Sequence, residues 1–237
     1  MRLLFLSNFY PPHALGGYEQ WCQEVATALE ARGHAVTILT SRYGIQPGQP
    51  EATPGVIRRL HLESDLYYYQ PLHFFGQRRR HERENQQILR QALHIYAPDA
   101  ILIWGMWNLS RNLPYWIEQW MPTQVAYFIS SYWPLDCDPH TAYWQLPANR
   151  KLTAGAKRLL RALALAQLRR EGYPPPLRFD HAVCCSQYVR TTLVAAKKLP
   201  PQAGVLLGGT DATPTCSLLP PRKHHQQIGC ACFTLDA

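Results

Sequence analysis

LLFLSNFYPPHALGGYEQWCQEVATALEARGHAVTILT, residues 3 to 40, is the stretch that decides the fold. Its opening apolar run, residues 3–6, predicts a strand buried on both faces of a sheet. Apolar side chains then recur at three- and four-residue steps from Tyr18 to Leu29, which predicts a helix with one apolar face. Gly33 stands where a helix C-cap glycine belongs, and residues 34–40 predict a second strand. Strand, glycine turn, helix and strand together make a βαβ unit.

The turn before this helix contains two consecutive glycines, Gly16 and Gly17. The first backbone N–H groups of a helix have no partner within the helix, and the helix dipole makes them partly positive. Glycines at this end leave room for close approach of a ligand. The pattern is compatible with a site for a phosphate or a developing negative charge, and equally with a tight turn that binds nothing.

The rest of the chain continues the alternation of strands and helices. The strands are predicted at residues 56–62, 100–104, 124–129, 181–185 and 204–207, and the helices at 72–96, within 108–121, at 151–171 and at 187–198. The stretches 44–55 and 135–150 are predicted to be irregular. Because strands and helices alternate, we expect an α/β fold in which a parallel sheet carries helices on both faces.

The charge balance, 24 Lys and Arg against 16 Asp and Glu, leaves a net charge of +8. This excess fits an acidic ligand, a nucleic acid or an anionic membrane surface. No nucleic-acid motif is present, so we expect no nucleic-acid partner. The helix at 151–171 is basic and amphipathic, and it suits either peripheral contact with a membrane or ordinary packing on the domain. The run Arg78-Arg79-Arg80-His81 is predicted to form a solvated face.

Neither a membrane-spanning run nor the apolar core of a signal peptide is apparent, so a cytoplasmic location is expected, with peripheral membrane contact through 151–171. The seven cysteines have no regular spacing. Cys22, Cys184 and Cys185 fall in apolar positions and are predicted to be buried free thiols. The pair Cys230 and Cys232 matches no common zinc spacing, so no metal site is predicted.

Five stretches, in sequence order, resemble one family. They are Leu3 to Ser41 with its Leu15-Gly16-Gly17-Tyr18-Glu19 and Arg32-Gly33-His34 segments, Ala97-Pro98-Asp99 with the strand after it, Ser130 to Leu135, Asp180 to Val189, and Gly208-Gly209-Thr210-Asp211. Together they resemble the N-terminal domain of the family 4 glycosyltransferases of the GT-B fold, over residues 1–211. The resemblance implies a Rossmann-like domain that takes part in transferring a sugar from a nucleotide-sugar to a glycan or lipid-linked acceptor. It implies no metal, and no cofactor besides the nucleotide-sugar substrate.

The resemblance also nominates site residues. Gly16 and Gly17 would face the donor phosphates and the reacting sugar. Loops at the carboxyl ends of the strands would hold the acceptor. The acceptor-binding candidates are Asn8, Tyr10, Glu19, Trp104, Asn108, Ser130, Ser131 and Trp133.

No catalytic residue is assigned, because the chain departs from the family pattern at two strand ends. Many relatives carry His at the end of the fourth strand, where this chain has Trp104, and His-Asp at the end of the fifth, where it has Ser130-Ser131. A serine pair is not a charged acid or base at neutral pH. Trp104 can stack on a sugar ring or fill the core.

The domain organisation predicted from the resemblance is a glycosyltransferase N-terminal domain at 1–211 and an irregular tail at 212–237. The donor-binding second domain is expected to be absent from this chain, since the tail is far shorter than a domain. The chain is therefore predicted to be an incomplete half of an enzyme, with the donor domain encoded separately or lost through a frameshift.

Two alternatives remain open. An NADP-dependent oxidoreductase is compatible with the βαβ start, although the turn is not G-x-G-x-x-G; Arg42 would suit a 2′-phosphate. A non-catalytic module that binds an anionic ligand or a membrane surface is compatible with the basic helices.

Overall fold

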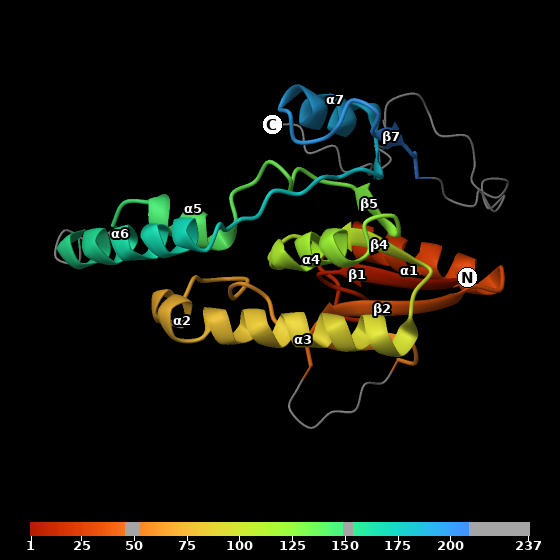
Figure 1. Cartoon of the computed structure of the whole chain (residues 1–237), viewed down its shortest axis with the longest axis horizontal. Helices are drawn as coiled ribbons and strands as arrows, with labels where there is room; N and C mark the ends of the chain where they lie inside the picture. Colours follow the sequence, from red (N-terminus) through yellow and green to blue (C-terminus); the bar gives the residue numbers. More distant parts are fainter. Residues whose placement is uncertain (46–52, 149–153, 209–237) are drawn as a thin grey trace, which may run out of the picture. The chain divides into compact units, whose positions relative to one another are not determined.

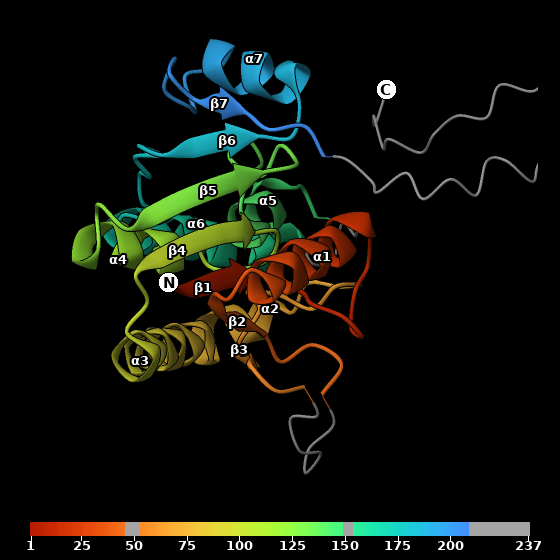
Figure 2. The same cartoon turned by 90° about the vertical axis from the view of Figure 1, so that its right-hand side faces the viewer.

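The fold is that of an α/β domain built on one parallel sheet, as seen in a computed structural model that describes residues 1–45, 53–148 and 154–208. The sheet has the order β3-β2-β1-β4-β5-β6-β7, and every strand pair is parallel (Figure 1; all the strands are labelled in Figure 2). The strands are β1 Arg2–Ser7, β2 Ala35–Ser41, β3 Val56–Leu60, β4 Ala100–Gly105, β5 Val125–Ile129, β6 Ala182–Cys184 and β7 Gly204–Val205. The predicted Rossmann-like arrangement is confirmed.

Helices cover both faces of this sheet (Figure 2). They are α1 Gly17–Ala31, α2 Pro71–Gly76, α3 Arg78–Tyr96, α4 Asn112–Trp120, α5 Pro139–Gln145, α6 Ala154–Arg170 and α7 Gln187–Ala195. Successive side chains of a strand point to opposite faces. Phe5 of β1 therefore packs with α1, whereas Leu4 and Leu6 pack in the core that α3, α4 and α7 cover.

The predicted βαβ start is present, and its helix ends as the sequence indicates. Gly33 has a left-handed φ of 82°. The N–H of His34 donates to the carbonyl of Leu29, and the N–H of Gly33 donates to that of Glu30. These two bonds are the Schellman pattern, which satisfies carbonyls at a helix end and turns the chain into β2.

The helix predicted at 72–96 is instead two helices. α2 ends at Gly76 and α3 begins at Arg78, with Gln77 between them at φ −120°. Glycine is a poor helix former, and here the break changes the direction of the chain. The solvated face predicted for residues 78–80 is also wrong in part, because Arg78 is buried and pairs with Glu171 while Arg79 and Arg80 are exposed.

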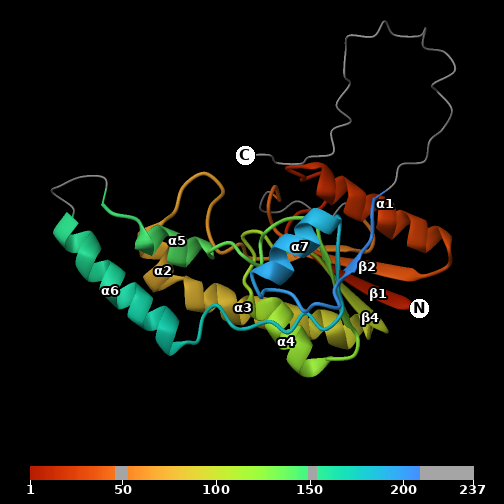
Figure 3. The ribbon, with the colours of Figure 1, turned by 90° about the horizontal axis from the view of Figure 1, so that it is seen from above.

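A helix, α5, lies in the stretch predicted to be irregular. Asp138 caps it by accepting a hydrogen bond from the Thr141 N–H at 2.9 Å, and Pro139 occupies its first turn. Both are ordinary helix-start signals. α2, α5 and α6 share a separate apolar cluster that includes Phe74, Trp144 and Leu168 (Figure 3).

The basic helix predicted at 151–171 is α6, but its packed face differs from the prediction. The side chains buried against the α2–α5–α6 cluster are Ala164 and Leu168, whereas Leu159 and Leu163 are 65% and 53% exposed. Leu160 and Leu165 also pack against this cluster, so α6 packs on the domain through one face while Leu159 and Leu163 face solvent. The tail at 212–237 lies outside the described residues, and the chain divides by its contacts into the units Met1–Leu207 and Gly208–Ala237.

Candidate functional site

The glycine turn before α1 is held by the helix itself. Gly16 is the N-cap, and its N–H donates to Glu19 Oε2 at 2.8 Å. A Cβ built on Gly17 would meet nothing within 4 Å, so the first helical residue faces open space. The end of the helix that carries the positive dipole is therefore accessible, while Glu19, named as an acceptor candidate, is buried and serves as the cap.

Asn8 follows β1 and is fully buried. Its Oδ1 accepts a hydrogen bond from the Tyr18 hydroxyl at 2.6 Å, and burial raises the pKa of Tyr18 well above its usual value. Gly105 of β4 lies so close that a Cβ there would be 2.5 Å from Asn8 Oδ1. Asn8 therefore links the start of α1 to the end of the sheet.

Trp104 and Trp133 are core residues. Trp104 is 3% exposed, stacks on Phe128 with ring centroids 4.3 Å apart, and donates its Nε1–H to the Tyr18 carbonyl. Trp133 is 4% exposed and packs against Phe179. Neither ring presents a face to a ligand in this structure, so the core alternative that the sequence left open for Trp104 is the observed one.

Of the remaining candidates, Tyr10 is buried, whereas Ser130 and Ser131 are accessible. Tyr10 is buried beneath Arg58, whose guanidinium donates to the Tyr10 carbonyl at 2.8 Å. Burial is the main cause that raises the pKa of Tyr10 to about 12. Ser130 is half-buried and Ser131 is exposed, directly after β5. These two serines remain accessible at the carboxyl edge of the sheet.

Asn108 is a buried residue that holds the loop after β3 in place. It is 5% exposed and adopts a left-handed φ of 58°. Its Oδ1 accepts from the N–H and the hydroxyl of Ser64, and its Nδ2 donates to the Ser64 carbonyl, at 3.1, 3.0 and 2.8 Å. The loop after β4 thereby fixes the loop after β3.

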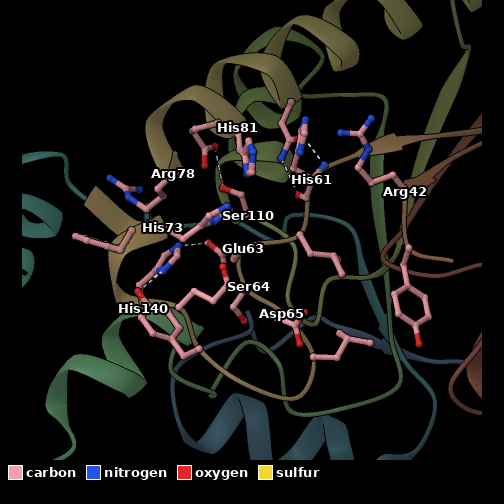
Figure 4. A pocket seen from close by; sticks show the side chains of 18 of the residues that line it. Arg42, His61, Glu63, Ser64, Asp65, His73, Arg78, His81, Ser110 and His140 are labelled. Atoms are coloured by element: carbon pink, nitrogen blue, oxygen red, sulfur yellow. Dashed lines mark hydrogen bonds and ion pairs between the residues drawn. The ribbon is translucent and has the colours of Figure 1, made fainter. Parts of the chain in front are cut away.

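A cavity of about 300 Å³ lies beyond the carboxyl ends of β2 and β3 (Figure 4). Its lining comes from the ends of β2 and β3, the start of α3, α2, Ser110 and His140. The wall contains the carboxylates of Glu63, Asp65 and Glu82 together with rings of Tyr67, Tyr69 and Phe74. Ligands of open α/β sheets bind outside the carboxyl ends of the strands, so the cavity lies at the edge where a ligand is expected.

Glu63 is the most deeply buried acid of the cavity wall. The Tyr173 hydroxyl donates to its Oε1, and His140 Nε2 lies 3.9 Å from the same oxygen. Burial, reinforced by Asp138, raises the pKa of the Glu63 carboxyl well above its usual value. Burial lowers the pKa of His140 to about 3, so its ring is neutral, and its Nδ1 forms a hydrogen bond with the Tyr69 hydroxyl at 2.9 Å.

Glu82 is another acid of the cavity wall. Its Oε1 accepts hydrogen bonds from the Ser110 hydroxyl at 2.8 Å and from Asn112 Nδ2 at 3.0 Å. Burial raises the pKa of the Glu82 carboxyl despite these bonds. Arg78 lies over the rings of Phe74 and Tyr173, so a cation is packed close to the buried acids.

None of the acceptor candidates chosen from the sequence lines this cavity. Most of the lining residues lie in the segments after β2 and β3 and on α2 and α3. The sequence signal for them was the run Tyr67-Tyr68-Tyr69, which interrupts the strand pattern.

Within the described ranges, no helix has the length and apolar character needed to cross a bilayer.

The thiols predicted to be buried are confirmed in part. Cys22 and Cys184 are buried and Cys185 is half-buried, and all are free. Burial raises the pKa of Cys184 to about 11 and that of Cys22 further. Neutral thiols are poor nucleophiles, so these cysteines act as packing groups.

A parallel sheet with helices on both faces defines a Rossmann-like α/β protein, a class whose ligands are usually bound beyond the carboxyl ends of the strands. The comparison with protein families names the group within that class. The model described as Glycosyltransferase Family 4 matches residues 15–212, and the chain belongs to this family. Comparison with curated proteins gives no match.

Proposed function

We propose that this chain supplies the acceptor-binding half of a glycosyltransferase that moves a sugar from a nucleotide-sugar to a glycan or lipid-linked acceptor. The observation that carries the proposal is the cavity beyond β2 and β3 in a family 4 glycosyltransferase domain. Carboxylates that accept hydrogen bonds stand beside aromatic rings in its wall. Sugars present both hydroxyl donors and apolar C–H faces, so this combination suits a saccharide.

The reacting end would lie near the start of α1. In the transfer, an acceptor hydroxyl oxygen bonds to the anomeric carbon, the bond to the phosphate oxygen breaks, and the phosphate carries away negative charge. Backbone N–H groups at an open helix N-terminus stabilise such charge. Gly16 and Gly17 are proposed for this role because Gly17 borders open space.

The donor itself would be held mainly by a second domain. Residues 1–211 are proposed as the N-terminal domain, and a donor-binding domain is proposed as its partner. No cofactor besides the nucleotide-sugar is proposed for the transfer. Ser130 and Ser131 are proposed to contact the acceptor at the sheet edge, since both remain accessible.

A membrane surface is proposed as a further partner. Leu159 and Leu163 stand out from α6, and Arg158 and Arg161 are exposed between them. Apolar side chains flanked by arginines bind the interface of an anionic bilayer. A lipid-linked acceptor would then reach the cavity from the membrane, and the chain would be cytoplasmic with peripheral attachment.

Binding to a microarray of saccharides and lipid-linked saccharides tests the acceptor role. We expect the purified chain to bind a defined subset. Asp65→Asn should weaken that binding, because it removes a carboxylate from the cavity wall while keeping an oxygen that accepts from the Tyr67 N–H, now at 2.9 Å from Asp65. Asp180→Asn is the matched control, since Asp180 is an exposed acid that pairs with Arg178. No saccharide binding, or equal loss in both variants, contradicts the proposal.

Transfer is tested with the chain joined to a reading frame that supplies a donor-binding domain. The fusion should transfer sugar, and the chain alone should not. Gly17→Asp should lower transfer by the fusion, because a carboxylate at the helix start repels the leaving phosphate. Robust transfer by the chain alone contradicts the need for a second domain.

An NADP-dependent oxidoreductase is the second candidate, favoured by one observation: Arg42, at the end of β2, lines the cavity. That is the strand end at which a ribose 2′-phosphate is held in dinucleotide-binding folds. Tight binding of NADP in calorimetry, lost in Arg42→Ala, would favour this candidate over sugar transfer.

A further inference from the structure

One group of metal-ligating side chains is found within the described residues, and two of its three members line the cavity, away from the glycine turn proposed for the leaving phosphate. It consists of His61, His81 and Glu84, whose potential ligand atoms all lie within 4.8 Å of one another. His61 directly follows β3, whereas His81 and Glu84 are three residues apart on α3. Residues at that spacing project from the same face of a helix, so the strand end and the helix meet at this group.

Asn85 fixes the backbone of His61 against α3. The His61 N–H donates to Asn85 Oδ1 at 2.7 Å, and Asn85 Nδ2 donates to the His61 carbonyl at 3.0 Å. The Asn85 side chain is 2% exposed. The backbone of the strand-end residue is thus held beside the helix by two buried hydrogen bonds, before any ion binds.

The donor set is chemically suited to zinc. The rings of His61 and His81 stack with centroids 4.0 Å apart, and His73 lies with its ring 5.1 Å from that of His81. A neutral imidazole has one ring nitrogen with a free lone pair for a metal ion. Two neutral imidazoles and one carboxylate are ligands that Zn²⁺ prefers, with a fourth position for water or another side chain.

A nearby cation determines which oxygen of the Glu84 carboxylate faces His61. Arg80 Nε donates to Glu84 Oε1 at 2.8 Å, which leaves Oε2 facing His61 Nε2 at 2.7 Å. Arg42 is the other cation whose charge acts on His61. These arginines oppose a dication, so the affinity should be below that of an all-cysteine zinc site.

We propose that His61, His81 and Glu84 form a zinc site that ties the loop after β3 to α3. Two ligands at about 2.0–2.1 Å from one ion stand no more than about 4.2 Å apart, so binding draws the side chains closer together and replaces the bond between His61 and Glu84. The loop held in this way carries Glu63, Ser64 and Asp65 of the cavity wall. The ion would order that wall without taking part in sugar transfer, and the inference stands independently of the proposed function.

Calorimetric titration of the EDTA-treated full chain with ZnCl₂ tests the site, together with Co²⁺ absorption as a report on coordination. We expect one zinc ion to bind through this group, with intense tetrahedral Co²⁺ bands that zinc abolishes. His81→Ala and the near-isosteric Glu84→Gln should each weaken binding by about tenfold or more, the scale on which zinc-site residues act. Zinc should raise the melting temperature of the unsubstituted chain more than that of either variant.

The matched control is His94→Ala, an exposed histidine near the end of the same helix. This variant should bind zinc as the unsubstituted chain does. Circular dichroism establishes that each variant is folded before titration. If the unsubstituted chain fails to bind zinc, or if His81→Ala and Glu84→Gln bind it as tightly as His94→Ala, the proposed site is refuted and any bound ion lies on other histidines or cysteines.

Discussion

Asn108 joins the loop after β4 to the loop after β3, and we predict that Asn108→Ala destabilises the protein by about 4–5 kcal/mol. Its side chain makes three hydrogen bonds to Ser64, each worth about 1 kcal/mol net. Asn108 also has a φ of 58°, where alanine pays about 1–2 kcal/mol and asparagine is better tolerated. The loss of the hydrogen bonds and the cost of the left-handed backbone add, because each lowers the free energy of unfolding through the folded state.

Asn108→Gly separates these two contributions. It removes the same hydrogen bonds but relieves the left-handed strain, at an entropy cost of about 0.5–1 kcal/mol. We expect Asn108→Gly to lose about 3.5–4 kcal/mol, so that it is about 0.5–1 kcal/mol more stable than Asn108→Ala. Urea unfolding followed by circular dichroism measures both differences, provided that the slope against denaturant is unchanged.

The result also decides what Asn108 does for the ligand. If it positions Ser64 in the cavity wall, both variants lose stability and saccharide binding together. If it contacts the acceptor directly, binding falls while the unfolding free energy changes by less than about 0.5 kcal/mol, as for a surface substitution. The second outcome, or equal stability of the Ala and Gly variants, would refute the reasoning.

Three further predictions concern other parts of the molecule. Gly105→Ala should cost about 1–3 kcal/mol in denaturant unfolding, because its Cβ would meet Asn8 Oδ1 at 2.5 Å, whereas Gly155→Ala, with nothing within 4 Å, should be neutral or stabilising. His140 has a folded pKa of about 3 against an ordinary 6.5, so its contribution to stability is full above pH 6.5 and is lost as the pH falls toward 3. His140→Gln should therefore show a shallower fall of the urea midpoint over that window, and parallel curves would contradict the assignment. Leu159→Glu on α6 should abolish binding to anionic vesicles in a sedimentation assay, while Ile95→Glu, an equally exposed apolar position on α3, should leave it intact.

The element order was predictable because it rests on local chemistry. A doubly buried strand needs a continuous apolar run, and the runs at β1 and β4 supply it. α1 needs an apolar face and a left-handed residue after its end, and Gly33 supplies the latter. Boundaries that depend on a single weak helix former were missed, as at Gly76, although the Asp138-Pro139 start of α5 was a readable signal.

The site was predicted less well, because exposure depends on residues distant in sequence. Trp104 and Trp133 follow or end strands at the expected edge, yet aromatic neighbours from other strands and loops enclose them. The Glu19 side chain caps a helix by accepting a hydrogen bond from the Gly16 N–H, and the Asn108 side chain holds a loop by donating to the Ser64 carbonyl. The cavity acids Glu63 and Glu82 lie 19 residues apart in segments with no recognisable motif.

The sequence by itself determined the alternating βα order, the parallel sheet and the open glycine turn, because hydrophobic periodicity and helix-end chemistry act over a few residues. The motif order also established the resemblance that the family comparison confirms. Only the tertiary structure decided which polar residues surround the cavity and which instead use their hydrogen bonds to cap a helix or to hold a loop. It also decided that Leu159 and Leu163 of α6 face outward and that His61 meets His81. These outcomes depend on how separate elements pack against one another, and that packing balances burial against hydrogen bonding over the whole domain.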